Sequence, residues 1–368
     1  MSVACCTCAA TYFTHYSPLK LIQNCPAIDV VYLWVDGNDP QWRSRRHLAR
    51  QQLTPVDQKQ LAAYSDVEGR FRDNDELRCS LRALAQFFPD HGHVYLVTDR
   101  QTPHWLRSHP RLTVIDHRDL IPRGSLPTFD SGHIESYIHR IANLSERYIY
   151  FNDDVFLGAP MDLRDWFFEG GVFVGWSQEA PVSDEPLQPG STALENACRR
   201  SIAWLRAEAA ASNRAPYLGD FRTFSHAPRP MLKSVMFTLE DIAPELFESV
   251  RSTVFRNWQH PTLVSDFVLR WSLLHGFAKA RDYRFAHVST GAPDSNDTLQ
   301  HIAQRLGAID FFCINDTTDD ACVDDPRLSR VRIALESMFT TPSPFERLEG
   351  VETPSARNPF VQRLEMAD

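Results

Sequence analysis

The chain has 368 residues, of which 43% are hydrophobic and 23% are charged, and its formal net charge is −9. This composition excludes a chain that is disordered throughout, and the acidic balance argues against nucleic acid as the main partner. No run of 18 or more consecutive apolar residues occurs, so we expect no membrane-spanning helix. The length allows one large domain or two of roughly 150 residues each.

Residues 1–26 are expected to form an irregular leader. Polar residues interrupt its apolar stretch and no Lys or Arg precedes Lys20, so it makes a poor signal peptide. Three of its four cysteines lie close together near the N-terminus, namely Cys5, Cys6 and Cys8. They allow a structural zinc site, but without a second ligand pair in the sequence they also fit the reduced thiols of a cytosolic protein.

Four apolar segments predict strands that are buried on both faces, as in a parallel sheet. They span residues 28–35, 93–98, 148–151 and 311–314. Each one runs directly, or within a residue, into acidic or amide side chains, the first of which are Asp36, Asp99, Asn152 and Asn315. Ligands of such sheets bind beyond the carboxyl ends of the strands, so these polar residues lie where a site is expected.

Amphipathic helices are expected between these strands. Asp73 and Glu76 have the spacing of a helix N-cap and its N3 partner, and apolar residues at helical spacing follow as far as Pro89. A second helix is expected from Ser131, with a buried stripe of Ile134, Ile138 and Ile141. The alternation of buried strands and amphipathic helices predicts an α/β fold with a mostly parallel sheet.

The pattern loosens between residues 160 and 225, apart from a helix expected over 195–211. Residues 226–280 are expected to be helical again, and the segment 341–368, rich in Pro, Ser and charge, is expected to be a flexible tail. We therefore predict one domain over residues 27–340 with a helical insertion at about 160–225.

The motif Asn152-Asp153-Asp154 follows a predicted strand directly. Adjacent carboxylates suit a divalent cation that bridges a diphosphate, because Mg²⁺ takes one or two carboxylates and completes its shell with phosphate oxygens and water. The alternative is a solvated turn, since Asp and Asn are common in turns. Apolar residues on both sides of the motif favour the cation site, because they fix the acids at a rigid strand end.

Basic and titratable residues form weaker candidates. Arg70 and Arg72, beside a predicted helix N-terminus, form either an anion site or a solvent-facing pair. Glu135 and His139 are spaced i, i+4, with Arg140 adjacent, and form either an oriented acid/base histidine or a surface pair.

His226 stands in a proline-rich loop, where a lone histidine is either structural or catalytic. Arg256 and Asp266 carry no local signal of their own. The sequence contains no Ser/His/Asp elbow, no Walker loop and no HExxH motif.

Taken together, these segments resemble the Stealth family of sugar-1-phosphate transferases. That family includes bacterial capsular and exopolysaccharide phosphotransferases and the animal N-acetylglucosamine-1-phosphotransferase. The resemblance covers roughly residues 28–320 in four blocks, which are residues 28–42, residues 70–158, the His226-x-Pro segment with the helix after it, and residues 313–316.

The resemblance implies a Rossmann-like, glycosyltransferase-type (GT-A-like) core and a nucleotide-sugar donor. The hexose would move together with its proximal phosphate to a glycan hydroxyl in capsular or exopolysaccharide synthesis, with release of a nucleoside monophosphate. Mg²⁺ or Mn²⁺ is the implied cofactor. The implied partners are the donor, a polysaccharide acceptor and a membrane-associated synthesis complex, and the implied location is the cytoplasm or the inner face of the membrane.

The resemblance also assigns roles to individual residues. His226 would be the base for the acceptor hydroxyl, and Arg256 and Arg72 would complete the catalytic group. The implied metal ligands are Asp153, Asp154 and Asp316. The implied donor-binding residues are Asp36, Asn38, Asp73, Asn74, Asp75, Glu135, His139, Arg140 and Asn152.

Two departures from the family pattern are visible. Thr317 follows Asp316 where a second acid is usual, and residues 130–133 differ, which bears on sugar or acceptor preference. Two alternative functions stay open from the sequence. One is an ordinary metal-dependent glycosyltransferase that releases a nucleoside diphosphate, and the other is a non-catalytic carbohydrate-binding protein.

Overall fold

The computed structural model describes residues 27–260, 262–316, 318–322 and 324–347. The predicted leader with Cys5, Cys6 and Cys8 lies outside the described residues, as does the segment 348–368. Within the described part of the chain, no helix is both long enough and apolar enough to cross a lipid bilayer.

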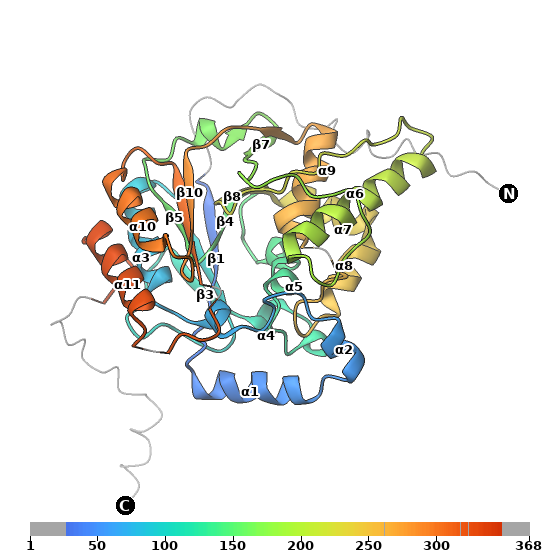
Figure 1. Ribbon diagram of the computed structural model, residues 1–368. Helices are drawn as coiled ribbons and strands as arrows, with labels where there is room; N and C mark the ends of the chain where they lie inside the picture. Colours follow the sequence, from blue (N-terminus) through green and yellow to red (C-terminus); the bar gives the residue numbers. More distant parts are fainter. Residues whose placement is uncertain (1–26, 261, 317, 323, 348–368) are drawn as a thin grey trace, which may run out of the picture.

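A five-stranded sheet forms the centre of the fold (Figure 1). Its strand order is β3 (Leu112–Asp116), β2 (Val94–Thr98), β1 (Asp29–Leu33), β4 (Arg147–Asn152) and β8 (Arg229–Leu232). The first four strands are parallel, whereas β8 is antiparallel to β4. Every residue of β1 and β2 is buried, which accounts for their continuous apolar sequences. The predicted α/β fold with a mostly parallel sheet is confirmed.

Helices lie on both sides of this sheet (Figure 1). One side carries α3 (Glu76–Phe87), α10 (Ser295–Gln304) and α11 (Pro326–Met338). The other side carries α5 (Ser131–Glu135), α6 (Ala193–Ala211), α7 (Lys233–Ile242), α8 (Pro244–Arg251) and α9 (Val268–His275). Two helices follow β1, namely α1 (Pro40–Gln51) and α2 (Pro55–Lys59), and the short α4 (His117–Leu120) follows β3.

The start of α3 differs from the prediction. Asp75 is the N-cap residue, with a φ of 66°, and the helix begins at Glu76. Asp73 instead accepts hydrogen bonds from the Asp75 amide at 2.9 Å and from Trp34 Nε1 at 3.2 Å. The predicted capping box of Asp73 and Glu76 is therefore wrong, because the left-handed Asp75 turns the chain just before the first helical turn.

A second sheet has the order β10 (Phe285–Ser289), β11 (Phe311–Asn315) and β5 (Val155–Leu157). The fourth predicted strand is therefore present as β11, but outside the central sheet. The strand β5 follows β4 after only two residues and pairs antiparallel with β11. The Ile314 amide donates to the Asp154 carbonyl at 3.0 Å, so the ends of β4 and β11 meet.

The predicted insertion contains more strand than expected. Two short strands, β6 (Phe167–Phe168) and β7 (Gly171–Val174), form a third sheet with β9 (Ala278–Ala280). The expected helix over 195–211 is present as α6, which begins two residues earlier behind a capping box of Thr192 and Glu195.

The segment 226–280 is only partly helical, which corrects the prediction. It opens with β8, whose Pro230 is tolerated because β8 is an edge strand of the central sheet and its missing N–H leaves no ladder bond broken. A π-helical turn over Leu263–Phe267 then precedes α9.

The beginning of the predicted tail is packed on the core. Phe345 is fully buried and Glu346 is 2% exposed. Glu346 accepts hydrogen bonds from Arg78 Nε at 2.7 Å and Arg82 Nε at 2.8 Å, both on α3. A buried carboxylate needs charged partners, and Glu346 has them on α3. The packed part of the chain therefore extends beyond the predicted boundary at residue 340.

We expect Glu346→Gln to lower the free energy of unfolding by about 2–3 kcal/mol, because the negative charge opposite Arg78 and Arg82 is removed and the amide nitrogen cannot accept from either arginine. The arginines hold the pKa of Glu346 at about 2 despite its burial. Its stabilisation is therefore fully present above about pH 4.5 and is lost as the pH falls toward 2. Urea unfolding at pH 7 and pH 3 measures both effects.

The matched control is Glu336→Gln on the exposed face of α11, for which a change below about 0.5 kcal/mol is expected. An equally small change for Glu346→Gln would contradict the anchoring role.

Candidate active site

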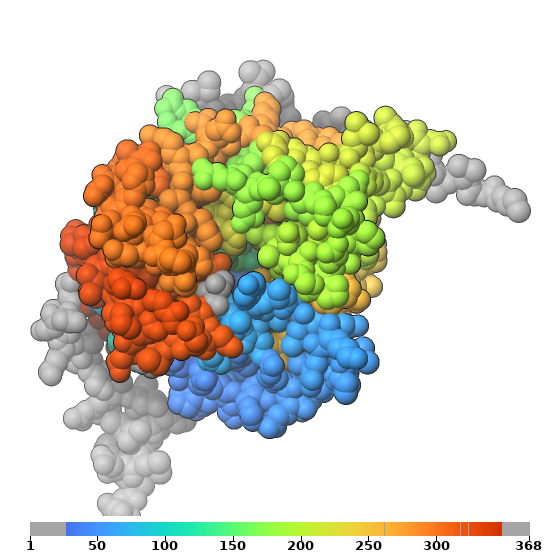
Figure 2. Space-filling view, viewed as in Figure 1, coloured from blue at the N-terminus to red at the C-terminus, as the bar shows by residue number. Residues whose placement is uncertain are grey.

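A cavity of about 200 Å³ lies beyond the carboxyl ends of β1, β4 and β11. Figure 2 shows a hollow where the blue N-terminal part, the green α6 region and the orange-red C-terminal part of the chain meet. The charged, amide and imidazole side chains that line this cavity are Arg70, Arg72, Glu76, His117, Glu135, Asn152, Asp153, Asp154, His226, Arg229, Arg256, Asn315 and Asp316. The site therefore lies where the strand ends predicted it.

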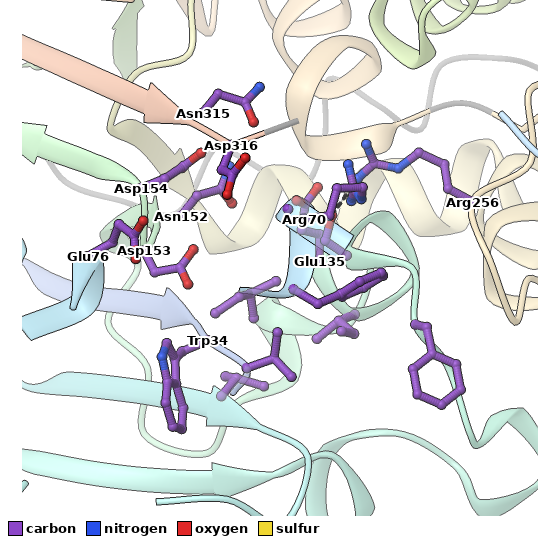
Figure 3. A pocket seen from close by; sticks show the side chains of 18 of the residues that line it. Trp34, Arg70, Glu76, Glu135, Asn152, Asp153, Asp154, Arg256, Asn315 and Asp316 are labelled. Atoms are coloured by element: carbon purple, nitrogen blue, oxygen red, sulfur yellow. Dashed lines mark hydrogen bonds between the residues drawn. The ribbon is translucent and has the colours of Figure 1, made fainter. Parts of the chain in front are cut away.

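The charges in this cavity are separated. Figure 3 shows Glu76, Asp153 and Asp154 on one side, and Arg70 and Arg256 on the other. A ligand that carries both a cation and anionic groups would match this arrangement, with its cation against the acids and its anions against the arginines.

Asp153 and Asp154 form the turn between β4 and β5. Burial, reinforced by the neighbouring Asp154, raises the pKa of Asp153 well above its usual range. Burial also raises the pKa of Asp154 to about 6. Asp154 Oδ1 is buried without a hydrogen-bond partner among the described residues. Two adjacent carboxylates with raised pKa values are stable there only if one binds a proton or if both face a bound cation.

We compared the acids with the needs of Mg²⁺ or Mn²⁺. No group of three or more His, Cys, Asp or Glu side chains within the described ranges is arranged to hold a metal ion. Asp153 and Asp154 nevertheless fit a cation shared with a diphosphate, since Mg²⁺ needs only one or two protein carboxylates.

Asp316 is committed elsewhere, which argues against its predicted role as a metal ligand. One of its oxygens pairs with Arg72, and the other accepts from the Thr318 amide at 2.9 Å and from Thr318 Oγ1 at 2.7 Å. Both carboxylate oxygens are thus used within the protein.

Arg256 is held firmly at the opposite side. Its Nε lies 3.3 Å from Asp130 Oδ1 and its Nη2 lies 2.5 Å from Ser131 Oγ. Asp130 is itself buried and accepts from Thr253 Oγ1 at 2.9 Å. These contacts fix the guanidinium without closing it off from the cavity that it lines.

His226 lines the cavity beside His287, with ring centroids 5.2 Å apart. Burial lowers its pKa to about 3, and His287 and the nearby arginines add to this effect. The imidazole is therefore neutral at neutral pH and has a free nitrogen lone pair.

Glu135 is 3% exposed and lies below the arginines. Its Oε1 lies 2.9 Å from the Tyr150 hydroxyl, which also lies 2.5 Å from Asn152 Oδ1. Its Oε2 has no partner among the described residues. Burial raises the pKa of Glu135, although Arg256 and Arg229 oppose the shift.

Comparison with known proteins identifies the family. Models of three Stealth conserved regions match the chain: region 1 at residues 26–54, region 2 at residues 70–173 and region 4 at residues 300–356. The chain belongs to the Stealth family. Region 1 contains β1 and α1, region 2 contains Arg70 and the Asp153-Asp154 turn, and region 4 contains β11 and Glu346.

Curated Stealth relatives carry the name exopolysaccharide phosphotransferase. SCO2592 of Streptomyces coelicolor is 34% identical over 87% of this chain and 33% of its own length. SCO6023 of the same organism is 35% identical over 88% of this chain and 53% of its own, and CpsY of Mycobacterium tuberculosis is 30% identical over 87% and 58%. The chain thus spans between one third and three fifths of these relatives.

Two solved glycosyltransferases have some similarity to the structure. The galactosyltransferase LgtC, in complex with donor and acceptor sugar analogs, has a TM-score of 0.41 at 10% identity over 86% of this chain and 98% of its own. The bifunctional glycosyltransferase WbbM has a TM-score of 0.42 at 9% identity over 87% of this chain and 51% of its own.

The structure brings together part of the predicted Stealth site. The predicted residues that line the cavity are Arg72, Glu135, Asn152, Asp153, Asp154, His226, Arg256 and Asp316. The predicted residues that do not line it are Asp36, Asn38, Asp73, Asn74, Asp75, His139 and Arg140.

Asp36 and Asn38 are used in the turn that leads into α1. Asp36 Oδ1 accepts from the Asn38 amide at 2.8 Å, and the Asp36 backbone pairs with the Gln101 side chain. Trp34 and Val35, just before them, line the cavity instead. Asp36 and Asn38 therefore lie next to residues of the cavity lining, and their predicted contact with the donor stays a prediction.

Asp73 and Asn74 contact residues that line the cavity, whereas Asp75 is the N-cap residue of α3 and donates its amide to Asp73. Asp73 holds the Trp34 indole, and Asn74 Nδ2 donates to Glu76 Oε1 at 2.9 Å. Both Trp34 and Glu76 line the cavity. In the structure Asp73 and Asn74 position Trp34 and Glu76, and the direct contact of Asp73, Asn74 and Asp75 with the donor stays a prediction.

His139 and Arg140 face away from the site. The predicted helix ends with α5 at Glu135 and continues as a 3₁₀ turn over Ile138–Arg140, so Glu135 and His139 do not share a face. His139 Nε2 instead lies 2.8 Å from Glu240 Oε2, and Arg140 pairs with the same carboxylate. Both alternatives for the Glu135–His139 pair are wrong.

Sequence reasoning missed Trp34, Glu76 and Arg229 as cavity residues. The sequence predicts Glu76 as a capping residue, because an acidic side chain near the start of a helix is typical of that role. Arg229, three residues beyond His226 on the edge strand β8, has no local signal that could have revealed it.

Proposed function

We propose that this Stealth chain is a sugar-1-phosphate transferase that uses a nucleotide-sugar donor and a glycan acceptor. The observation that carries the proposal is the cavity at the strand ends, with Asp153 and Asp154 facing Arg70 and Arg256. A metal-bound diphosphate carries the complementary charges. The names of the relatives, exopolysaccharide phosphotransferases, support the same reaction class.

In the proposed reaction, the acceptor hydroxyl oxygen attacks the phosphorus that bears the sugar. A new O–P bond forms, and the bond between that phosphorus and the bridging oxygen breaks. The bridging oxygen leaves with the nucleoside monophosphate, and the hydroxyl proton passes to a ring nitrogen of His226. Such phosphoryl transfer depends on positioning and on stabilisation of charge.

The remaining residues supply that stabilisation. Asp153 and Asp154 would hold Mg²⁺ or Mn²⁺, which when bound would offset charge on the diphosphate. Arg256, fixed by Asp130 and Ser131, would face the charge that develops on the transferred phosphoryl group. Arg72 would act through Asp316 to fix the wall of the pocket.

The acceptor and the location belong to the same proposal. A capsular or exopolysaccharide hydroxyl is the proposed acceptor, in keeping with the names of the relatives. A cytoplasmic location, free or at the inner face of the membrane in a synthesis complex, stays a prediction.

A screen of nucleotide-sugars tests the function. Each donor is incubated with the full chain and Mg²⁺ or Mn²⁺, with and without short glycan acceptors, and the released nucleotide is identified. We expect nucleoside monophosphate whose release depends on acceptor and metal and is about 10³-fold slower with Asp153→Asn. Release of nucleoside diphosphate would identify an ordinary glycosyltransferase, and binding without release would identify a carbohydrate-binding protein. Either result overturns the proposal.

We expect His226→Ala to lower turnover by about 10²-fold, because the attacking hydroxyl loses its proton acceptor. Donor affinity should change little, since the neutral imidazole contributes no charge to it. Steady-state kinetics of monophosphate release measures both parameters.

His275→Ala, at the end of α9 and outside the cavity lining, is the matched control and should keep the parent turnover. If His226→Ala also stayed within about threefold of the parent, another group would have to accept the proton.

A further inference from the structure

Arg70 is a cation of the cavity whose buried Nε has no hydrogen-bond partner among the described residues. It lies in the 3₁₀ turn over Glu68–Phe71, directly before the segment that leads into α3. No ion pair to its guanidinium is found within the described residues. Arg70 is half-buried, and leaving its buried Nε without a partner is costly, which is a reason to look for an absent anion.

The neighbouring arginine shows what ordinary satisfaction looks like. Arg72, two residues further along, pairs with Asp316 and donates to Thr318 Oγ1 at 3.1 Å and to the Ala321 carbonyl at 3.0 Å. Both arginines line the same cavity. Arg72 is thus held by hydrogen bonds and an ion pair, whereas no such partner of the Arg70 guanidinium is found within the described residues.

The charges around Arg70 point to the same conclusion. Arg256 lies on the same side of the cavity and repels it, while Asp130, Asp154 and Glu135 attract it without reaching it by a hydrogen bond. Burial, followed by this repulsion, lowers the pKa of Arg70 to about 9, so it is still charged at neutral pH. A dianionic group between the two guanidinium groups would remove the repulsion and satisfy the free donors.

We propose that Arg70 is a phosphate-binding residue, which together with Arg256 holds the phosphate that carries the sugar. The inference rests on the proposed function and names a further donor-binding side chain for it. The planar guanidinium fork matches the oxygens of a phosphate, so Arg70 would bind the group that moves while Asp153 and Asp154 face the other end of the diphosphate.

Inorganic pyrophosphate is a probe that needs no turnover. Urea unfolding of the full chain is followed with and without pyrophosphate, in EDTA and in Mg²⁺, for the parent, Arg70→Met and Arg72→Met. We expect pyrophosphate to raise the unfolding midpoint of the parent. In Arg70→Met the midpoint without ligand should be equal or higher, because a charged group whose Nε is buried without a partner is removed, while pyrophosphate affinity falls by about tenfold or more.

Arg72→Met is the structural contrast, and it should lower the midpoint without ligand because Asp316 loses its partner. Arg164→Met, whose side chain is 89% exposed, controls for the change in charge and should behave like the parent. The proposal is overturned if Arg70→Met destabilises the chain as Arg72→Met does, if it binds pyrophosphate like the parent, or if pyrophosphate does not stabilise the parent. Since none of these readings uses the released nucleotide, failure of the proposed function is detected separately.

Discussion

Asp153→Asn is expected to lower the turnover of the proposed transfer by about 10³-fold, or about 4 kcal/mol. The amide keeps the size of the side chain but cannot supply the negative oxygen that a divalent cation needs. The fold should not suffer, because Asp153 lies in a turn and burial disfavours its charged form. Monophosphate release and urea unfolding of the same preparation measure both effects.

The stability of Asp153→Asn without metal shows whether the charge of Asp153 stabilises or destabilises the folded chain. The pKa of Asp153 is raised in the folded chain, so its ionisation opposes folding at every pH above its ordinary value near 4. At pH 7 the variant should therefore be at least as stable as the parent, and the difference should vanish near pH 4. A loss of stability at pH 7 would show instead that Asp153 has a structural role.

Asp310→Asn is the matched control for this prediction. Asp310 pairs with Arg284 outside the cavity, so its loss should leave turnover unchanged. If Asp153→Asn retained turnover within about threefold of the parent, the acidic side of the cavity would not take part in the reaction.

The dependence of the parent on pH follows from the neighbouring carboxyl. Burial raises the pKa of Asp154 to about 6, and a protonated carboxyl cannot bind a cation. Burial also raises the pKa of Asp153 well above its usual range, so transfer at limiting Mg²⁺ should decline as the pH falls, with the decline beginning at or above about pH 6. A rate that stays constant down to pH 4.5 would contradict this assignment.

The strands of the central sheet could be predicted where burial alone decides their sequence. The strands β1, β2 and β4 are covered on both faces, so their apolar runs do not depend on any distant contact. The strand β3 lies at the edge, and its residues are exposed or half-buried, so it lacks such a run and was missed.

The acidic part of the site could be predicted for a related reason. Asp153 and Asp154 are adjacent in sequence and follow a strand directly, so local pattern and final position coincide. Asp36 and Asn38 also follow a strand directly, but the Asp36 side chain accepts from the Asn38 amide and closes the turn before α1. The sequence does not distinguish an acid that caps a turn from one that faces a cavity.

The partners of the arginines could not be predicted at all. Arg72 and Asp316 are 244 residues apart, and Arg256 and Asp130 are 126 residues apart. Neither pair lies within one element. The packing of α3 and β11 against β5 brings Arg72 to Asp316, and the packing of the α8 region on α5 brings Arg256 to Asp130. The sequence predicts both Arg72 and Arg256 as site residues, but only the structure shows which carboxylate each guanidinium contacts.

The second large effect is expected at Arg256, which lines the cavity. We expect Arg256→Lys to lower turnover by about 10²-fold or more while the KM for the donor changes less than about threefold, since an arginine that faces a transferred phosphoryl group is worth 10³-fold or more in related chemistry. A lysine keeps the charge but loses the contact of Nε with Asp130 and the planar fork. Steady-state kinetics of monophosphate release separates the two parameters.

Asp130→Asn tests how the guanidinium is held. The amide oxygen can still accept from the Gly132 amide at the start of α5, so the helix cap is kept while the charge opposite Arg256 is removed. We expect about tenfold lower turnover, and less than additive loss when it is combined with Arg256→Lys, because both changes disturb one contact. Arg251→Lys, whose partners Glu240 and Ser136 lie outside the cavity lining, should alter stability without altering turnover. If Arg256→Lys behaved like Arg251→Lys, Arg256 would be a structural arginine, and the charge on the transferred group would have to be met by Arg70 and Arg229 alone.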